Sequence, residues 1–340
     1  MKERRKEPID FSVLRPAGSY LDDVRELMKS LDEAEASAGL LKKETEEPAQ
    51  QASSAPQQKT EQEKTPEKTL EELMAELDGL VGLQKVKENV KSLMNLVKVR
   101  KLRQENGLPT PPLSLHLVFL GNPGTGKTTV ARLIAGLYRA IGVLEKGQLV
   151  EVDRSGLVAG YVGQTAGKTG EVIGKAIGGV LFIDEAYALA KPDGQNDFGQ
   201  EAIETLLKAM EDHRDELVVI VAGYEEQMER FISSNPGLES RFNRYLVFED
   251  YTGEELLQIF LSLCRKNGYE PDEEAGAYAA ELFERMYEQR DENFGNGRTV
   301  RNFFENAVAA QSDRVAAMEA PGVGDLKTFT RTDLEQAEIS

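Results

Sequence analysis

The chain has 340 residues, a net charge of −18 at neutral pH and 40% hydrophobic residues, which favours two domains or slightly more with a sizeable core. The negative charge argues against a large nucleic-acid or anionic-membrane surface. No apolar run approaches the roughly 20 residues that a membrane helix needs, so we expect no membrane insertion.

Cysteine and histidine exclude further classes of protein. The single cysteine, Cys264, cannot form an intramolecular disulfide, and no secretory segment is visible at the N-terminus, so a cytoplasmic location is expected. The two histidines, His116 and His213, stand apart from cysteine or carboxylate clusters at ligand spacing, which argues against a structural zinc site. No serine-histidine-aspartate or cysteine-histidine arrangement suggests nucleophilic catalysis.

Residues 1–40 form an N-terminal segment with one helix candidate, residues 22–33. Its apolar residues share one face: Val24, Leu27, Met28 and Leu31. Two interpretations stay open for so short a helix: it docks on a partner protein, or it frays because it has no stability of its own. Residues 41–69 are predicted to be a disordered linker, because almost no side chain there could offset the entropy of ordering.

Residues 70–250 alternate between short apolar runs and helical stretches. A long amphipathic helix is predicted directly after Leu80–Leu83. Five apolar runs are strand candidates: residues 115–120, 149–152, 180–183, 217–222 and 245–248. This alternation predicts an α/β domain with a five-stranded parallel sheet and helices on both faces.

Residues 251–340 lose the strand pattern. Thr252 and Glu255 have the spacing of a capping box at the start of a helix. Two further helical segments follow, one with Leu282 and Phe283 and one with Phe303 and Phe304 on their apolar faces. We expect a small all-helical domain to close the chain.

Gly121–Thr128 has the spacing G-x-x-x-x-G-K-[ST] and stands between a strand candidate and a helix. Glycines let the backbone wind so tightly that its amides and the helix N-terminus converge on phosphates. Lys127 is expected to reach the β- and γ-phosphates, and the Thr128 hydroxyl to bind Mg²⁺. The expected nucleotide-binding residues here are Gly121, Asn122, Pro123, Gly124, Thr125, Gly126, Lys127, Thr128 and Thr129.

The buried strand candidate at residues 180–183 ends in Asp184 and Glu185. Ligands gather at the carboxyl ends of parallel strands, so both carboxylates should lie beside the phosphate loop. Asp184 is expected to hold Mg²⁺ through water, and Glu185 to orient or deprotonate the attacking water. The guanine-reading pattern Asn-Lys-x-Asp is absent, so we expect ATP by elimination.

These residues resemble the AAA+ ATPases, in the branch that contains stage V sporulation protein K and the red-type Rubisco activase. The resemblance covers roughly residues 71–340. It also rests on Leu80–Leu83, Gly160–Thr165, Ala222–Tyr224, Ser240–Phe242 and Gly295–Asn302. It implies a three-layer P-loop domain over residues 70–250, a helical lid over 251–340, and a homo-oligomeric ring, typically a hexamer, acting on a client protein.

The resemblance also implies roles for single residues around the nucleotide. Val81 and Gly82 would line the adenine pocket, although an apolar helix entry fits equally well. Arg241 matches an arginine finger that completes the neighbouring subunit's site, with Arg244 as the alternative. Arg298 matches a γ-phosphate sensor, with Arg301, three residues later on the same helix face, as the alternative.

Two more positions bear on mechanism through the same resemblance. Tyr161, Val162 and Gly163 match a pore loop that grips substrate polypeptide, for which a rigid amphipathic ring is suited. Many AAA+ ATPases have Asn or Thr at the end of the fourth strand to position water, whereas this chain has Tyr224 near that place. The turnover rate is therefore left open.

The leading hypothesis is an ATP-hydrolysing motor that remodels a partner protein as a ring. A sporulation role and a Rubisco-activase-like role are both compatible with it, and the sequence does not identify the client. Alternatives from other classes are a small-molecule phosphotransferase and a nucleotide-gated assembly scaffold. Tyr161 and Arg241 favour the motor over the phosphotransferase, and Glu185 argues against the scaffold.

Overall fold

The computed structural model describes residues 68–111, 113–161, 163–190 and 198–339. The predicted docking helix, and the predicted linker apart from its last two residues, lie outside these ranges. The chain divides into two compact units. Of the described residues, the sheet unit holds 68–251 together with Asp291–Arg298, and the helical unit holds Thr252–Arg290 and the residues from Thr299 onward. Within the described ranges, no helix has the length and apolar character that crossing a membrane requires.

Five parallel strands in the order β2-β3-β4-β1-β5 form the centre of the sheet unit. They span Leu117–Leu120 (β1), Leu149–Val152 (β2), Val180–Ile183 (β3), Val218–Gly223 (β4) and Tyr245–Val247 (β5). β1, β3 and β4 are buried along their whole length, as strands covered on both faces must be. The predicted five-stranded parallel sheet is confirmed.

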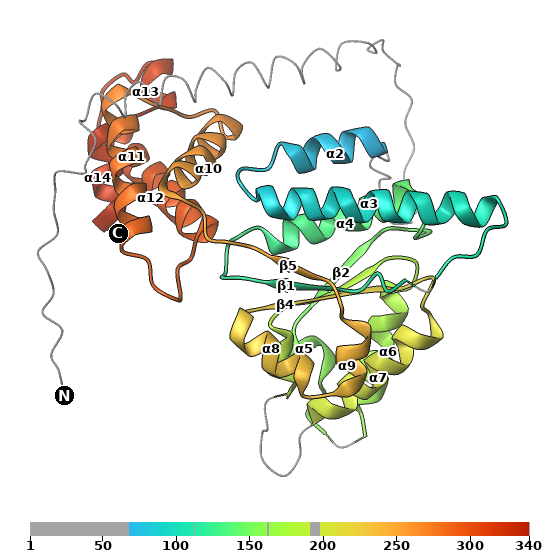
Figure 1. Cartoon of the computed structure of the whole chain (residues 1–340). Helices are drawn as coiled ribbons and strands as arrows, with labels where there is room; N and C mark the ends of the chain where they lie inside the picture. Colours follow the sequence, from blue (N-terminus) through green and yellow to red (C-terminus); the bar gives the residue numbers. More distant parts are fainter. Residues whose placement is uncertain (1–67, 112, 162, 191–197, 340) are drawn as a thin grey trace, which may run out of the picture. The chain divides into compact units, whose positions relative to one another are not determined.

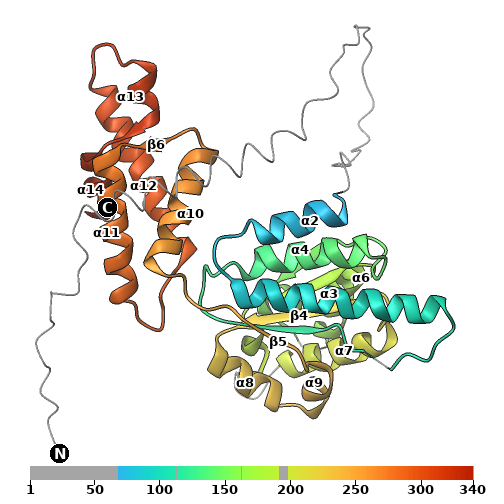
Figure 2. The same ribbon diagram turned by 45° about the horizontal axis from the view of Figure 1, so that its top comes forward.

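Helices cover both faces of this sheet (Figure 1). One face carries α2 (Leu70–Asp78), α3 (Gln84–Glu105) and α4 (Lys127–Ala140). The other carries α5 (Arg154–Leu157), α6 (Thr165–Ala176), the short 3-10 helix η2 (Ala186–Ala190), α7 (Phe198–Asp212), α8 (Glu225–Ser233) and α9 (Pro236–Arg241). Figure 2 shows the same three layers from another angle. Strand residues alternate between the two cores: Phe119 joins the first and Val118 the second.

Side-chain caps start several of these helices where the sequence has short polar residues. The Thr69 hydroxyl accepts from the backbone N–H of Glu72, and the Glu72 carboxylate accepts from the backbone N–H of Thr69, so α2 begins with a capping box. Asp153 caps α5 in the same way through the backbone N–H of Gly156. The Asp153 cap thus starts α5 directly after β2.

The helical unit contains α10 (Gly253–Lys266), α11 (Glu273–Glu288), most of α12 (Gly297–Ala316), α13 (Val323–Lys327) and α14 (Arg331–Ile339). The predicted capping box of Thr252 and Glu255 is present at the start of α10. The prediction that this part is entirely helical is wrong in one detail. Strands β6 (Glu270–Pro271) and β7 (Thr328–Phe329) form a two-stranded parallel ladder, which is too short to leave an alternating pattern in the sequence.

Aromatic rings form the core of the helical unit around Phe260 of α10. Its ring centroid lies 5.7 Å from that of Phe283, 5.5 Å from Phe303 and 6.4 Å from Phe329. These offset and tilted pairs are the arrangements that aromatic side chains prefer. Phe329 belongs to β7, so the small ladder brings the last part of the chain onto the helices that the sequence predicted.

A buried ion pair ties α14 to α12, and its loss should open the helical unit. Arg314 donates to both carboxylate oxygens of Asp333, at 2.8 and 3.0 Å, and only 1% of the Asp333 side chain is exposed. Asp333→Ala breaks these charge-assisted hydrogen bonds and leaves Arg314, which is 24% exposed and still donates to the Thr328 carbonyl, so it should lower the free energy of opening by about 2 kcal/mol. Hydrogen exchange of α12 and α14 amides measures it, and Glu335→Ala, which removes an exposed pair with Arg331, is the matched control.

The same pair makes the helical unit acid-sensitive. Burial by itself would raise the pKa of Asp333, but the hydrogen bonds from Arg314 and from the Thr330 backbone N–H outweigh it and hold the pKa below the ordinary value of 3.8. The stabilisation is therefore complete above the unfolded-state pKa and is lost as the pH falls through the lower folded-state value. Equal exchange rates in Asp333→Ala and the parent at neutral pH would contradict this assignment.

Candidate active site

The loop between β1 and α4 has the backbone shape that its glycines predict. Gly121, Gly124 and Gly126 have φ angles of 142°, 75° and 91°, in the region that favours glycine. A Cβ atom on Gly124 would lie 2.2 Å from the carbonyl oxygen of Gly295, so even alanine does not fit there. The loop is a tight cradle whose amides lead into the N-terminus of α4 at Lys127, which fits an anionic phosphate.

Lys127 is held inside this cradle. Its ammonium group donates to the carbonyl oxygens of Gly121 at 2.8 Å and of Asn122 at 2.7 Å. Burial lowers the pKa of Lys127 to about 8, against the opposing effect of the Asp184 carboxylate, and the Arg298 charge lowers it further. A half-buried cation with reduced hydration is ready to pair with a phosphate.

Asp184 and Glu185 follow β3 at the carboxyl edge of the sheet. The Asp184 backbone N–H donates to the carbonyl oxygen of Val152, which continues the ladder to β2, and Asp184 contributes to the pKa of Lys127. Glu185 is exposed and has a φ angle of 48°, a strained conformation for a residue with a side chain. The Thr128 hydroxyl lies 3.4 Å from a carboxylate oxygen of Glu151, at the end of β2. The structure thus brings the phosphate loop and the predicted carboxylates together.

Tyr187 is a site residue that the sequence analysis missed. Its hydroxyl hydrogen-bonds Glu185, and burial, with the Glu185 charge next in size, raises the pKa of Tyr187 to about 12. Its ring centroid lies 6.2 Å from that of Tyr224, and a Cβ atom on Gly223 would meet the Tyr187 ring at 2.7 Å. The phenol next to Glu185 is therefore that of Tyr187, and the Tyr224 ring lies beside the Tyr187 ring. Its place two residues after Glu185 was the available signal.

Asn296 and Asp250 form a second feature that sequence reasoning did not single out. Asn296 is fully buried with a φ angle of 50°, and its amide donates to Asp250 at 2.7 Å. Asn122 of the loop donates to the same carboxylate at 3.0 Å, and the Gly297 N–H donates to the carbonyl of Gly124 at 3.1 Å. This network anchors the segment before α12 on the phosphate loop.

Arg298 comes from that anchored segment, at the start of α12. It belongs to the same compact unit as the phosphate loop, and its charge acts on Lys127. Arg301 lies one turn further along α12, is exposed and belongs to the helical unit. Of the two predicted alternatives, Arg298 is the one that the structure places with the loop.

The turn that contains Val81 and Gly82 also packs against the loop. Gly82 and Leu83 have φ angles of 58° and 57°, and the buried Lys87 ammonium donates to the carbonyl oxygen of Leu80, which holds the turn. A Cβ atom on Gly126 would lie 3.5 Å from the Leu83 side chain. This apolar turn therefore forms one wall beside the start of α4.

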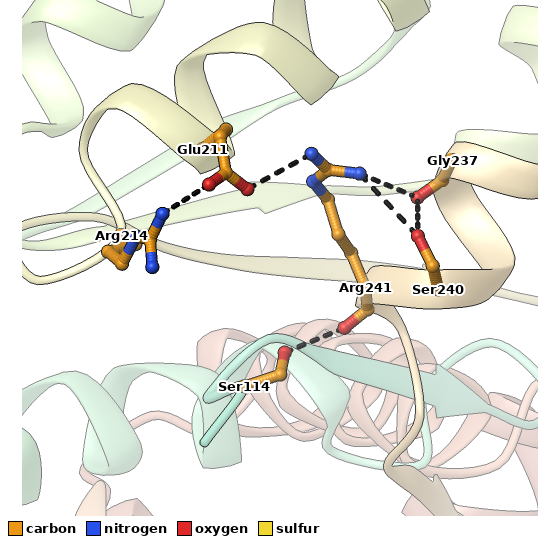
Figure 3. Close-up of polar contacts among 6 residues, drawn as sticks. All are labelled: Ser114, Glu211, Arg214, Gly237, Ser240 and Arg241. Atoms are coloured by element: carbon orange, nitrogen blue, oxygen red, sulfur yellow. Dashed lines mark hydrogen bonds and ion pairs between the residues drawn. The ribbon is translucent and has the colours of Figure 1, made fainter. Parts of the chain in front are cut away.

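The predicted finger, Arg241, lies at the end of α9 against the end of α7. Its guanidinium forms an ion pair with Glu211 at 3.2 Å, and Figure 3 shows it directed toward that helix. Arg244 follows three residues later, is half-buried and acts electrostatically on the Tyr138 hydroxyl in the core. Both arginines are half-buried, and each acts electrostatically on a buried group, Arg244 on Tyr138 and Arg241 on His116. Arg241 differs in its ion pair with the exposed carboxylate of Glu211.

The Tyr161 side chain is 74% exposed and follows Gly160, in the connection between α5 and α6. Gly163 has a φ angle of 76°, and Val162 lies outside the described residues. A cleft of about 480 Å³ reaches from Glu185 to Asp153 and to Gly160, next to Tyr161. The exposed ring therefore stands on a loop whose base lines the same cleft as Glu185.

The strand order, the phosphate cradle and the two carboxylates define a P-loop ATPase. A mutant RuvB structure from Thermotoga maritima has the same fold, with a TM-score of 0.51 and 21% identity over 77% of this chain and 72% of that chain. The family model described as "ATPase family associated with various cellular activities (AAA)" matches residues 117–250, and the AAA lid domain matches residues 252–340.

Curated relatives identify the family more closely. A chloroplastic ribulose bisphosphate carboxylase/oxygenase activase from Cyanidioschyzon merolae is 45% identical over 78% of this chain and 88% of its own length. Stage V sporulation protein K of Bacillus subtilis is 42% identical over 79% and 84%, and protein CbbX of Cereibacter sphaeroides 43% identical over 79% and 87%. The chain belongs to the AAA ATPase family, in the branch of these relatives, and is an ATPase.

Proposed function

We propose that the chain is an ATP-driven motor that assembles into a ring, with six subunits as in the expected hexamer, and remodels a client protein. The observation that carries the proposal is the exposed Tyr161 ring on a loop whose base adjoins the cleft at Glu185. A change at the catalytic carboxylate can thereby reach a side chain suited to gripping polypeptide. The similarity to a ribulose bisphosphate carboxylase/oxygenase activase supports the same class of activity.

Each predicted site residue has a role in this proposal. The loop from Gly121 to Thr129 cradles the phosphates of ATP, with the ammonium of Lys127 on them, and Val81 and Gly82 border the base. Thr128 and Asp184 would hold Mg²⁺, which supplies charge neutralisation on the phosphates. Glu185 orients and deprotonates the attacking water, and Arg298 contacts the γ-phosphate.

Arg241 acts across the ring in this proposal. Its position at the outer end of α9, next to α7, supports delivery to a neighbouring subunit. Arg244 is the alternative finger, and its charge acts on the Tyr138 hydroxyl of its own chain. A guanidinium is the appropriate group because it stays charged and donates in a fixed planar geometry.

The organisation and partners of the chain follow the same reasoning. Residues 70–250 would form the ATPase domain and 251–340 the lid, and the N-terminal 69 residues would deliver a client or locate the ring. The net charge of −18 supports a protein client in the cytoplasm rather than nucleic acid. The phosphotransferase and scaffold alternatives are not favoured, because the chain's relatives are ATPases of this family.

A substitution in the pore loop tests the motor. Tyr161→Ala should keep ATP hydrolysis within about twofold of the parent but lower client remodelling by about tenfold or more, because the aromatic contact with polypeptide is lost. The client is first identified by its capture on the full-length Glu185→Gln variant, and remodelling is then followed by hydrogen exchange of that client. Tyr161→Phe keeps the aromatic side chain and is the matched control. Unchanged remodelling by Tyr161→Ala would reject threading through the pore.

A further inference from the structure

The guanidinium of Arg241 is occupied by groups of its own chain. Its Nη2 lies 3.2 Å from Glu211 Oε2, and its Nη1 donates to the Gly237 carbonyl at 3.4 Å and to the Ser240 hydroxyl at 3.5 Å. The Ser114 hydroxyl donates to the Arg241 backbone carbonyl at 2.7 Å, which fixes the start of the side chain. Only 27% of the side chain is exposed. Figure 3 shows these contacts.

Glu211 serves two arginines at once. One carboxylate oxygen pairs with Arg241, and the other accepts from Arg214, which lies three residues after Glu211. Glu211 and Arg214 are well exposed, at 55% and 63% of their side chains, whereas Arg241 is more covered. Figure 3 shows Glu211 between the two guanidinium groups.

His116 is another titratable group near Arg241, but it does not bind the Arg241 guanidinium in place of Glu211. His116 is buried, its Nδ1 accepts from the Val219 N–H at 3.0 Å, and its ring packs on Phe242. Burial, with the nearby Arg241 charge second, lowers the pKa of His116 to about 4, so the imidazole is neutral at physiological pH. The carboxylate of Glu211 is therefore the charge that holds the guanidinium.

This geometry makes the release of Arg241 inexpensive. Leaving a carboxylate without a partner raises the free energy when no other positive charge replaces the lost one. Glu211 would keep Arg214 after Arg241 left, so only a half-exposed ion pair and two long hydrogen bonds would be broken. Exposed pairs change equilibria by factors of about two to five, which is small against the charge of a phosphate. The contact is thus strong enough to bias the position of Arg241 and weak enough to break.

We propose that Glu211 is a positioning residue for the arginine finger: it holds Arg241 within its own subunit in competition with the neighbour's phosphate, and Arg214 retains Glu211 when Arg241 crosses. This inference rests on the proposed role of Arg241 as the finger. Glu211 and Arg214 would then have opposite effects on ATP hydrolysis. In the contacts that the structure describes, neither residue touches the nucleotide site of its own chain.

Substitutions of Glu211 and of Arg214 should change kcat for ATP hydrolysis in opposite directions. In the full-length protein, Glu211→Gln should raise kcat for ATP hydrolysis by about two- to fivefold, because the finger is released. KM for ATP should not change, because Arg241 acts on the neighbour's transition state rather than on ATP binding. Arg214→Gln should lower kcat by a similar factor, because Glu211 would then hold Arg241 alone.

Coupling between the variants separates this proposal from a purely structural role. The double variant Glu211→Gln/Arg214→Gln should match Glu211→Gln alone, because Arg214 acts only through Glu211. Glu226→Gln is the matched control, since it also removes one negative charge and breaks an exposed pair, with Arg230. Its kcat should equal that of the parent.

Three results would overturn the proposal. Unchanged kcat in both single variants, a fall in kcat for Glu211→Gln, or an additive double variant would each be incompatible with competition for Arg241. Arg241→Ala is measured in the same series. If Arg241→Ala keeps full activity, the finger assignment itself fails and this inference fails with it, whereas a strong loss in Arg241→Ala with a neutral Glu211→Gln rejects only the role of Glu211.

Discussion

Glu185→Gln should retain ATP but hydrolyse it about 100- to 10,000-fold more slowly than the parent. Glutamine has the same shape as glutamate but cannot take a proton from the attacking water. Glu185 is exposed at the carboxyl end of β3, is held by the hydroxyl of Tyr187, and adopts a strained backbone with a φ angle of 48°. Strain of this kind persists where surrounding contacts support a functional position. Phosphate release under single-turnover conditions measures the rate, and filter retention of labelled ATP measures binding.

A control variant separates catalysis from charge. Glu216→Gln makes the same change just before β4, at the opposite end of the strands, where Glu216 forms an exposed pair with His213. It should hydrolyse ATP at the parental rate. Hydrolysis by Glu185→Gln within tenfold of the parent, with ATP still bound, would show that another group activates the water.

Arg241→Ala should lower ATP hydrolysis by about 1,000-fold, the lower end of the range for an arginine finger. Because the finger is proposed to act on the neighbouring subunit, the loss should be rescued by mixing. A Lys127→Ala subunit cannot hold phosphates but still carries Arg241, so mixed rings of the two inactive variants should regain turnover. The rate is measured against the proportion of the two subunits at constant total protein.

Two observations would contradict the transfer of Arg241 between subunits. Mixtures that show only the sum of two inactive proteins would place the function of Arg241 in its own subunit. Arg244→Ala is the comparison variant: its side chain acts on Tyr138 in the interior, so its loss should affect stability more than turnover. A stronger catalytic loss in Arg244→Ala than in Arg241→Ala would assign the finger to Arg244.

Local spacing was enough to predict the sheet and the nucleotide loop. The run Val180–Ile183 is apolar on both faces and ends in two carboxylates, and a parallel sheet necessarily brings such strand ends to one edge. Gly121, Gly124 and Lys127 are likewise encoded within one turn of chain, where short-range sterics decide the conformation. Patterns of this kind involve neighbours in the sequence and need no knowledge of distant contacts.

The rest was decided by contacts between residues far apart in the sequence. Asn296 reaches Asp250 across 46 positions, Arg241 reaches Glu211 across 30, and β6 pairs with β7 through residues that leave no periodic signal. Residues such as these have no local preference that reveals the partner, because the pairing depends on how the whole chain closes. The sequence by itself therefore determined the fold class and the phosphate-binding chemistry, whereas only the tertiary structure showed which side chains hold Glu185, Arg241 and the segment of Arg298 in place.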